Sequence, residues 1–126
     1  MAVTPHDLVV EAKSQIKEVS TAEAQVQMTK STIIDVREYD EFAAGHLPGA
    51  INIPRGVLEF KIGTVGECAD KAKPYLIYCR TSGRAALSTV QLQKIGYTNL
   101  ASMAGGFEAW AKESRPVDKP APVNFD

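Results

Sequence analysis

The stretch that decides the fold is Tyr75-Leu76-Ile77-Tyr78-Cys79-Arg80-Thr81-Ser82-Gly83-Arg84. Its first four residues form a short apolar run, which is typical of a buried strand. The residues that follow, up to Gly83, are small, polar or charged and predict a loop. From Arg84 to Ile95 the pattern is helical, and Gly96 ends it. A buried strand followed by a short loop and a helix is the repeating unit of a parallel sheet, so the stretch predicts an α/β fold.

The same alternation of strands and helices continues on both sides of this stretch. Capping boxes at Thr4 and Ser20 predict two helices, the first with Pro5 at its first position. The strands predicted along the chain cover residues 16–19, 32–36, 50–53, 75–78 and 100–103. The other predicted helices cover 38–44, about 57–62, 84–95 and the segment after Gly105-Gly106. Ligands of parallel sheets bind beyond the carboxyl ends of the strands, and Cys79 stands at such an end.

The composition is that of an ordinary globular domain. The chain has 126 residues, 44% hydrophobic and 23% charged, with a net charge of −1. This balance provides no basic field for nucleic acid or anionic lipid. The uncharged stretches are too short for a transmembrane helix. We expect one domain over residues 1–114, followed by a proline-rich tail, 115–126, that is extended and loosely attached.

The beginning of the chain bears on its location. Residues 1–10 lack the basic and apolar regions of a secretory signal. We therefore expect a cytoplasmic protein. The alternative is that the sequence is a mature form from which a leader has been removed.

The two cysteines, Cys68 and Cys79, are too few for a disulfide framework. With His6 and His46 they match no zinc-binding spacing, so we predict no metal and no cofactor. Each cysteine is then either a small buried hydrophobic residue or a reactive thiol.

The surroundings of Cys79 favour a reactive thiolate. The short loop after it lets backbone N–H groups turn inward as an anion-binding nest, and the following helix contributes its N-terminus. Arg80 and Arg84 add positive charge and planar donor groups. The alternatives are an inert buried thiol and two arginines that are ordinary surface charges. Cys68 has no comparable setting, and we expect it to be a bystander.

Two groups of motifs then stand out along the chain. The first comprises Asp35-Val36-Arg37-Glu38, Glu41-Phe42, Gly45-His46-Leu47-Pro48-Gly49-Ala50 and Asn52-Ile53-Pro54. The second comprises Tyr78-Cys79-Arg80-Thr81-Ser82-Gly83-Arg84, Gly105-Gly106-Phe107 and Trp110. In this order and at this separation they resemble the single-domain rhodaneses, the thiosulfate sulfurtransferase family, over residues 5–113.

The resemblance implies a parallel five-stranded sheet with helices on both faces. It implies that Cys79 is the nucleophile, which takes sulfane sulfur from thiosulfate or a persulfide and passes it on as a persulfide. The acceptor would be cyanide or a thiol, with a protein as a further candidate. The substrate-binding residues would be those of the loop: Arg80, Thr81, Ser82, Gly83 and Arg84.

The length of the loop separates sulfur chemistry from phosphorus chemistry. In this family, relatives that act on phosphate or arsenate carry one more residue between cysteine and arginine, so the spacing here favours sulfur. A cysteine phosphatase or arsenate reductase is the less favoured alternative, and a non-enzymatic persulfide carrier or regulatory module is another. Ser82 occupies a position where the family often has glycine, so a positive φ is expected to have moved to Gly83.

Five further residues are expected to support the site. Asp35 and Arg37 would form an ion pair that holds loops in place, and His46 would have a packing and hydrogen-bonding role. Gly105 and Gly106 would allow a close approach to the loop after Cys79. Phe107 and Trp110 are expected in the core.

Overall fold

The computed structural model describes residues 2–120 and contains one parallel sheet of five strands. The strands are ordered β1-β5-β4-β2-β3, and every adjacent pair is parallel. Their bounds are β1 Glu18–Val19, β2 Thr32–Asp35, β3 Ile51–Asn52, β4 Tyr75–Tyr78 and β5 Leu100–Met103. β4 is therefore the central strand, and its carboxyl end leads directly to Cys79. The predicted parallel five-stranded α/β fold is confirmed.

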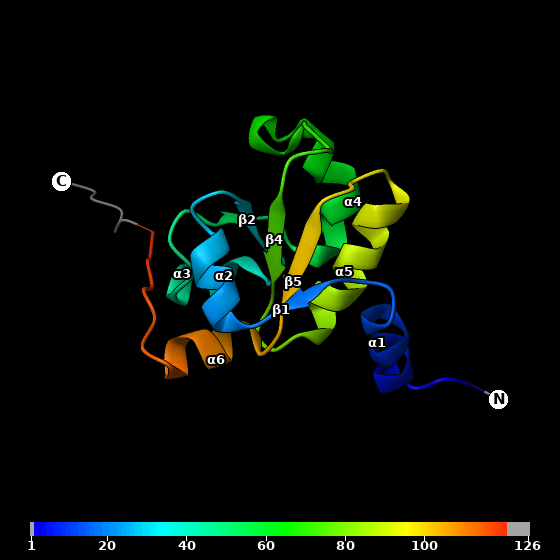
Figure 1. Cartoon of the computed structure of the whole chain (residues 1–126), viewed down its shortest axis with the longest axis horizontal. Helices are drawn as coiled ribbons and strands as arrows, with labels where there is room; N and C mark the ends of the chain where they lie inside the picture. The colour runs from blue at the N-terminus through cyan, green and yellow to red at the C-terminus, as the bar shows by residue number, and fades with distance from the viewer. Residues whose placement is uncertain (1, 121–126) are drawn as a thin grey trace.

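Helices cover both faces of the sheet (Figure 1). The α-helices are α1 Pro5–Lys13, α2 Thr21–Gln27, α3 Tyr39–Ala44, α4 Leu58–Lys61, α5 Gly83–Lys94 and α6 Gly106–Lys112. α4 and α5 pack on one face around Leu58, Ile77 and Leu92. α2 and α6 pack on the other around Ala24, Leu76 and Trp110. α1 lies against the outer side of α5, where Ala12 meets Ala86 and Val90.

Local sequence signals account for most of these elements. Both predicted capping boxes form, between Thr4 and Asp7 and between Ser20 and Glu23. The segment after β3 differs from the expected single helix. It contains α4 and three 3₁₀ turns, η1 Arg55–Val57, η2 Ile62–Thr64 and η3 Gly66–Cys68. Gly56, Gly63 and Gly66 interrupt this segment, and glycine is a poor residue for the interior of a helix.

The beginning of the predicted tail is packed against the domain, which corrects the expectation that it is loosely attached. The indole Nε1 of Trp110 donates a hydrogen bond of 2.6 Å to the carbonyl oxygen of Pro116. The backbone of Asp118 exchanges two hydrogen bonds with that of His46, at 2.8 and 2.9 Å. Because Trp110 is fully buried, it fixes the chain to α6 just beyond the predicted boundary at residue 114. Residues 121–126 of the predicted tail lie outside the described residues.

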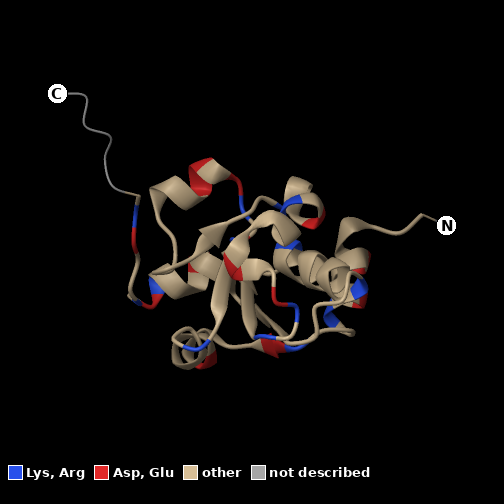
Figure 2. Cartoon of the chain, turned by 90° about the horizontal axis from the view of Figure 1, so that it is seen from above, with Lys and Arg blue, Asp and Glu red and all other residues tan. Residues whose placement is uncertain are grey.

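Acidic and basic residues are interspersed over the helices and loops (Figure 2). None of the described helices combines the length and the apolar character that a membrane span requires. Within residues 2–120, no three or more His, Cys, Asp and Glu side chains are grouped in a way that could hold a metal ion.

Candidate active site

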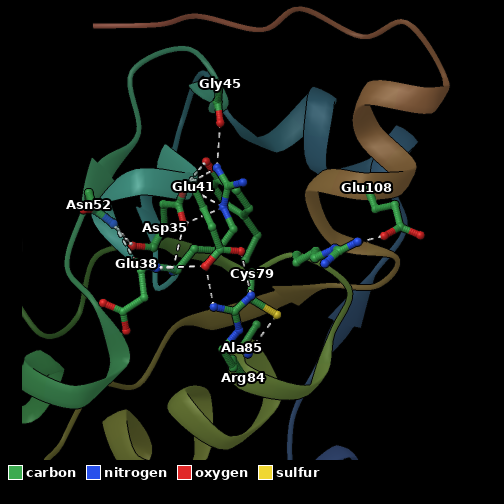
Figure 3. Close-up of polar contacts among 12 residues, drawn as sticks. Asp35, Glu38, Glu41, Gly45, Asn52, Cys79, Arg84, Ala85 and Glu108 are labelled. Carbon is green, nitrogen blue, oxygen red and sulfur yellow. Dashed lines mark hydrogen bonds and ion pairs between the residues drawn. The ribbon is translucent and has the colours of Figure 1, made fainter. Parts of the chain in front are cut away.

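Cys79 lies at the carboxyl end of β4, next to Arg84 and Ala85 of the first turn of α5 (Figure 3). Its side chain faces the side of the sheet that α5 covers, and the residue is only 1% exposed. Its Sγ accepts a hydrogen bond of 3.3 Å from the backbone N–H of Ala85, the third residue of α5. The Ser82 side chain at the N-cap makes no capping hydrogen bond. The sulfur therefore takes the acceptor role that a capping side chain has at other helices.

The loop between Cys79 and α5 presents free backbone donors. Among the described residues, the N–H groups of Thr81, Ser82, Gly83 and Arg84 donate to no protein acceptor. Unpaired N–H groups at a helix N-terminus favour negative charge. These free donors are compatible with the anion-binding role that the sequence predicts for the loop next to Sγ.

The prediction that Gly83 has a positive φ is wrong. Within residues 2–120, positive φ values occur at Ser114 and at glycines 45, 49, 96, 105 and 106. Gly83 is instead the first residue of α5, and an added Cβ there would lie 3.3 Å from Cγ2 of Val9 in α1. The glycine thus serves the packing of α1 against the first turn of α5, which sequence reasoning missed.

Gly106 allows the close approach that the sequence predicted. Its φ is +59°, and an added Cβ would lie 2.5 Å from the carbonyl oxygens of both Arg80 and Thr81. The next two residues bind the loop, because the N–H of Phe107 donates to the Cys79 carbonyl at 2.8 Å and that of Glu108 donates to the Arg80 carbonyl at 2.9 Å. Gly105 caps α6 with a φ of +79°. The start of α6 therefore fixes the backbone of the loop.

Arg84 is paired with Glu41 of α3. Its two terminal nitrogens donate to the two carboxylate oxygens at 2.7 and 2.9 Å. The hydrogen bonds from Arg84 lower the pKa of Glu41 from 4.5 to about 2. Those same bonds raise the pKa of Arg84, and the charge of Glu41 adds to the effect. The pair ties α3 to the first turn of α5 beside the sulfur (Figure 3).

Arg80 is paired with Glu108, at 3.2 Å. The two side chains are 69% and 59% exposed, so this ion pair contributes little to stability. The sequence predicted that both loop arginines would be available to an anionic donor, and in the structure each has a carboxylate partner. Glu41 and Glu108 were not predicted in this role. They lie 43 and 28 residues from their arginines, beyond the reach of any local pattern.

The expected ion pair between Asp35 and Arg37 forms below the loop. The guanidinium donates to both carboxylate oxygens, with Nη2 at 2.8 Å, and also to the carbonyl of Gly45 at 2.7 Å. The hydroxyl of Tyr78 donates to Asp35 at 2.7 Å and accepts from the N–H of Leu47. Burial and the charge of Asp35 raise the pKa of Tyr78, so it remains a neutral donor. This network fixes the residue that precedes Cys79.

His46 contacts residues other than the loop. Its ring stacks on Phe42 at a centroid distance of 3.8 Å, and its Nδ1 lies 3.0 Å from the Phe42 carbonyl. Its backbone pairs with Asp118. These contacts agree with the packing role expected for it.

A pocket of about 350 Å³ opens beside the loop on the α3 and α6 side. It is lined by Arg37, Glu41, Ala44, Arg80, Phe107 and Glu108. Cys79 is not part of its lining. Since the residue is nearly inaccessible, a reactant reaches Sγ only when the loop or the side chains around it move. A pocket of about 250 Å³ at the opposite edge of the sheet is lined by residues such as Lys17, Tyr75 and Asn99, and neither Cys68 nor Cys79 is part of its lining.

Cys68 lies elsewhere, at the end of η3, and is completely buried. Burial raises the pKa of its thiol. Among the described residues, no arginine affects the pKa of this thiol and its sulfur accepts no hydrogen bond, in keeping with a bystander.

Known proteins show the same architecture. The Rhodanese-like domain model matches residues 18–113. Thiosulfate sulfurtransferase 16 of Arabidopsis thaliana is 32% identical over 92 residues, which cover 67% of this chain and 77% of that protein.

Two solved structures are similar over most of their length. A Rhodopseudomonas palustris protein of unknown function, described as a possible tyrosine phosphatase, is 27% identical with a TM-score of 0.82, covering 94% of this chain and 96% of that one. The human single-domain sulfurtransferase TSTD1 is 26% identical with a TM-score of 0.70, covering 76% and 96%. On the family match and the shared fold, this chain belongs to the rhodanese-like domain family.

Proposed function

We propose that the protein is a sulfurtransferase that carries sulfane sulfur on Cys79. The observation that carries this proposal is the position of Sγ, which accepts a hydrogen bond from the N–H of Ala85. In the loop beside it, four further N–H groups have no acceptor among the described residues. That arrangement stabilises a thiolate and, after sulfur transfer, a persulfide anion.

In the first half of the reaction, the Cys79 thiolate attacks the outer sulfur of thiosulfate. A new S–S bond forms at Cys79, the S–S bond of thiosulfate breaks, and its electron pair leaves with sulfite. No proton needs to move, which fits a site whose stabilising groups are N–H donors. An organic persulfide can replace thiosulfate, with a thiolate as the leaving group.

In the second half, a nucleophilic acceptor attacks the outer sulfur of the Cys79 persulfide. The acceptor, cyanide or the thiolate of a small thiol or a protein, gains the sulfur, and the Cys79 thiolate leaves with the electron pair. The cycle is a ping-pong reaction through a covalent intermediate. The N–H groups from Thr81 to Ala85 accommodate the extra sulfur atom between the two steps.

The spacing from Cys79 to Arg84 favours sulfur over a phosphate ester. The structure adds that the two loop arginines are already paired with carboxylates, whereas a phosphate dianion in the loop needs their charge. One solved relative is nevertheless described as a possible phosphatase, so hydrolysis of p-nitrophenyl phosphate belongs in the test.

The test measures thiocyanate formation from thiosulfate and cyanide by the wild type, Cys79→Ser and Cys68→Ser. We expect turnover in the wild type and in Cys68→Ser, background rates in Cys79→Ser, and no ester hydrolysis. Mass spectrometry should show one added sulfur atom on Cys79 after incubation with thiosulfate.

Each other outcome points elsewhere. Turnover by Cys79→Ser would show that Cys79 is not the nucleophile. A persulfide on Cys79 without multiple turnovers would identify a persulfide carrier, whose acceptor is a partner protein. A folded wild type that accepts no sulfur from any donor would identify a regulatory module. For either role we propose a cytoplasmic location.

A further inference from the structure

Most arginines of this protein are already neutralised. Of the five in the sequence, four form ion pairs: Arg37 with Asp35, Arg80 with Glu108, Arg84 with Glu41 and Arg115 with Glu113. Three of these pairs surround the loop of Cys79. An anionic donor that used one of them would have to share it with a carboxylate.

Arg55 is the exception among the described residues. It forms no ion pair and no side-chain hydrogen bond, although Glu59 lies one helical turn further on. Its Nε is buried and has no hydrogen-bond partner. A buried donor without an acceptor is costly, and such a group in a native fold calls for an explanation, of which an absent ligand is one.

The backbone places Arg55 at the same edge of the sheet as Cys79. Its N–H donates to the carbonyl of Val36 at 3.0 Å, and the N–H of Val36 donates to the carbonyl of Tyr78 at 3.0 Å. Arg55 and Cys79 therefore stand two strand spacings apart, roughly 10 Å between backbones. An extended arginine side chain covers most of that separation.

The direction of the side chain follows from the turn that contains it. Arg55 begins η1, and the N–H of Leu58 donates to its carbonyl. Residues three apart in a 3₁₀ turn lie on the same face. Leu58 is fully buried in the same cluster as Cys79 and Ala85, so Arg55 leaves the turn on the side of the sheet that the Cys79 side chain faces.

We propose that Arg55 binds the negatively charged group of the sulfur donor while Sγ attacks the outer sulfur. This inference rests on the proposed function and assigns its donor-binding residue. The guanidinium can donate two hydrogen bonds to a sulfonate, and it does so without displacing a carboxylate. The donor class is a sulfane sulfur compound with an oxyanion end, such as thiosulfate, bound from the η1 and α4 side of the loop.

The two half-reactions separate binding of the donor from a structural role. Loading of Cys79 by thiosulfate is followed in single turnovers, and unloading of the preformed persulfide is followed with 2-mercaptoethanol, an uncharged thiol. For Arg55→Gln we expect the thiosulfate concentration at half-maximal loading to rise roughly tenfold to a hundredfold, the loss of a charge-assisted pair of hydrogen bonds. Unloading should be unchanged, and Arg55→Lys should recover part of the loading.

Lys61→Gln is the matched control, since Lys61 is an exposed cation on the same segment, at the end of α4. It should leave both half-reactions unchanged. Arg80→Gln is compared in parallel and should weaken loading less than Arg55→Gln does.

Three results would overturn the inference. They are unchanged loading in both Arg55 variants, an equal loss in loading and unloading, and a larger effect of Arg80→Gln. In each of them the wild type still forms a persulfide, so the proposed function stands. A wild type that no donor loads would overturn the function, and the inference with it.

Discussion

The two cysteines are equally hidden from solvent and differ in almost everything else. Cys68 is 0% exposed and Cys79 is 1% exposed. Around Cys68 burial dominates, and it disfavours the thiolate by raising the pKa. Around Cys79 the sulfur accepts an N–H from the first turn of a helix, next to free N–H groups and an arginine.

Exposure alone therefore does not separate the proposed nucleophile from the other cysteine in this protein. The decisive difference is the element that follows each residue. Cys79 directly follows a strand and precedes the N-terminus of a twelve-residue helix, whereas Cys68 ends a short turn. Three features hold Cys79 and its loop in place, and each can be altered separately. They are the buried Asp35 network, the close contact of Gly106 with the loop, and the ion pair between Arg84 and Glu41.

The largest expected effect comes from the buried network of Asp35, Arg37 and Tyr78. Asp35→Asn leaves the buried guanidinium of Arg37 without its counter-charge and should lower the free energy of unfolding by about 3–5 kcal/mol. Urea unfolding at neutral pH measures it. Asp40→Asn, an exposed change in the first turn of α3, should cost under about 1 kcal/mol. Similar losses in both variants would contradict the role given to the Asp35 network.

The close contact between Gly106 and the loop after Cys79 gives the next largest effect. In Gly106→Ala the new Cβ meets two carbonyl oxygens at 2.5 Å, and the residue must keep a φ of +59°. We expect a loss of about 3 kcal/mol and slower sulfur transfer, because the loop has to shift. Gly49→Ala is the control, with a φ of +79° and open space around the Cβ. It should cost about 1 kcal/mol and leave transfer unchanged, and equal losses would show that backbone strain alone matters.

The ion pair beside the sulfur should make stability depend on pH. Folding lowers the pKa of Glu41 from 4.5 to about 2, so the stabilisation is fully present above pH 4.5 and is lost as the pH falls towards 2. Because both side chains are partly exposed, we expect about 1–2 kcal/mol rather than the full value of the shift. Unfolding of Glu41→Gln should be less sensitive to pH between 5 and 2 than that of the wild type. Glu59→Gln, which removes a glutamate without an ion pair, should retain the wild-type profile.

The smallest effect is expected from a change at the other cysteine, Cys68. Cys68→Ala removes a buried sulfur atom from a core cluster and should cost about 1 kcal/mol of stability. Loading of Cys79 with sulfur should be the same as in the wild type. A large fall in sulfur transfer, with stability nearly retained, would mean that Cys68 takes part in the chemistry.

Much of the fold follows from patterns within a few residues. The capping boxes at Thr4 and Ser20 and the apolar runs of β2, β4 and β5 predicted elements that the structure contains. The region after β3 was predicted less well, since short 3₁₀ turns have no strong periodicity. The tail was predicted from its prolines alone. Its hydrogen bonds depend on the buried position of Trp110 and on His46, which is far from it in the sequence.

The sequence by itself determined where the proposed nucleophile lies, because a strand, a short loop and a helix in succession place the thiol of Cys79 at a helix N-terminus. Only the tertiary structure decided which charges surround it. Glu41 and Glu108 come from α3 and α6, and they reach the loop arginines because those helices pack beside the end of β4. Local conformation depends on neighbours along the chain, whereas an ion pair depends on which elements meet in space. For that reason Arg84 and Arg80, prominent in the sequence, are occupied, and Arg55, unremarked there, is free of a partner among the described residues.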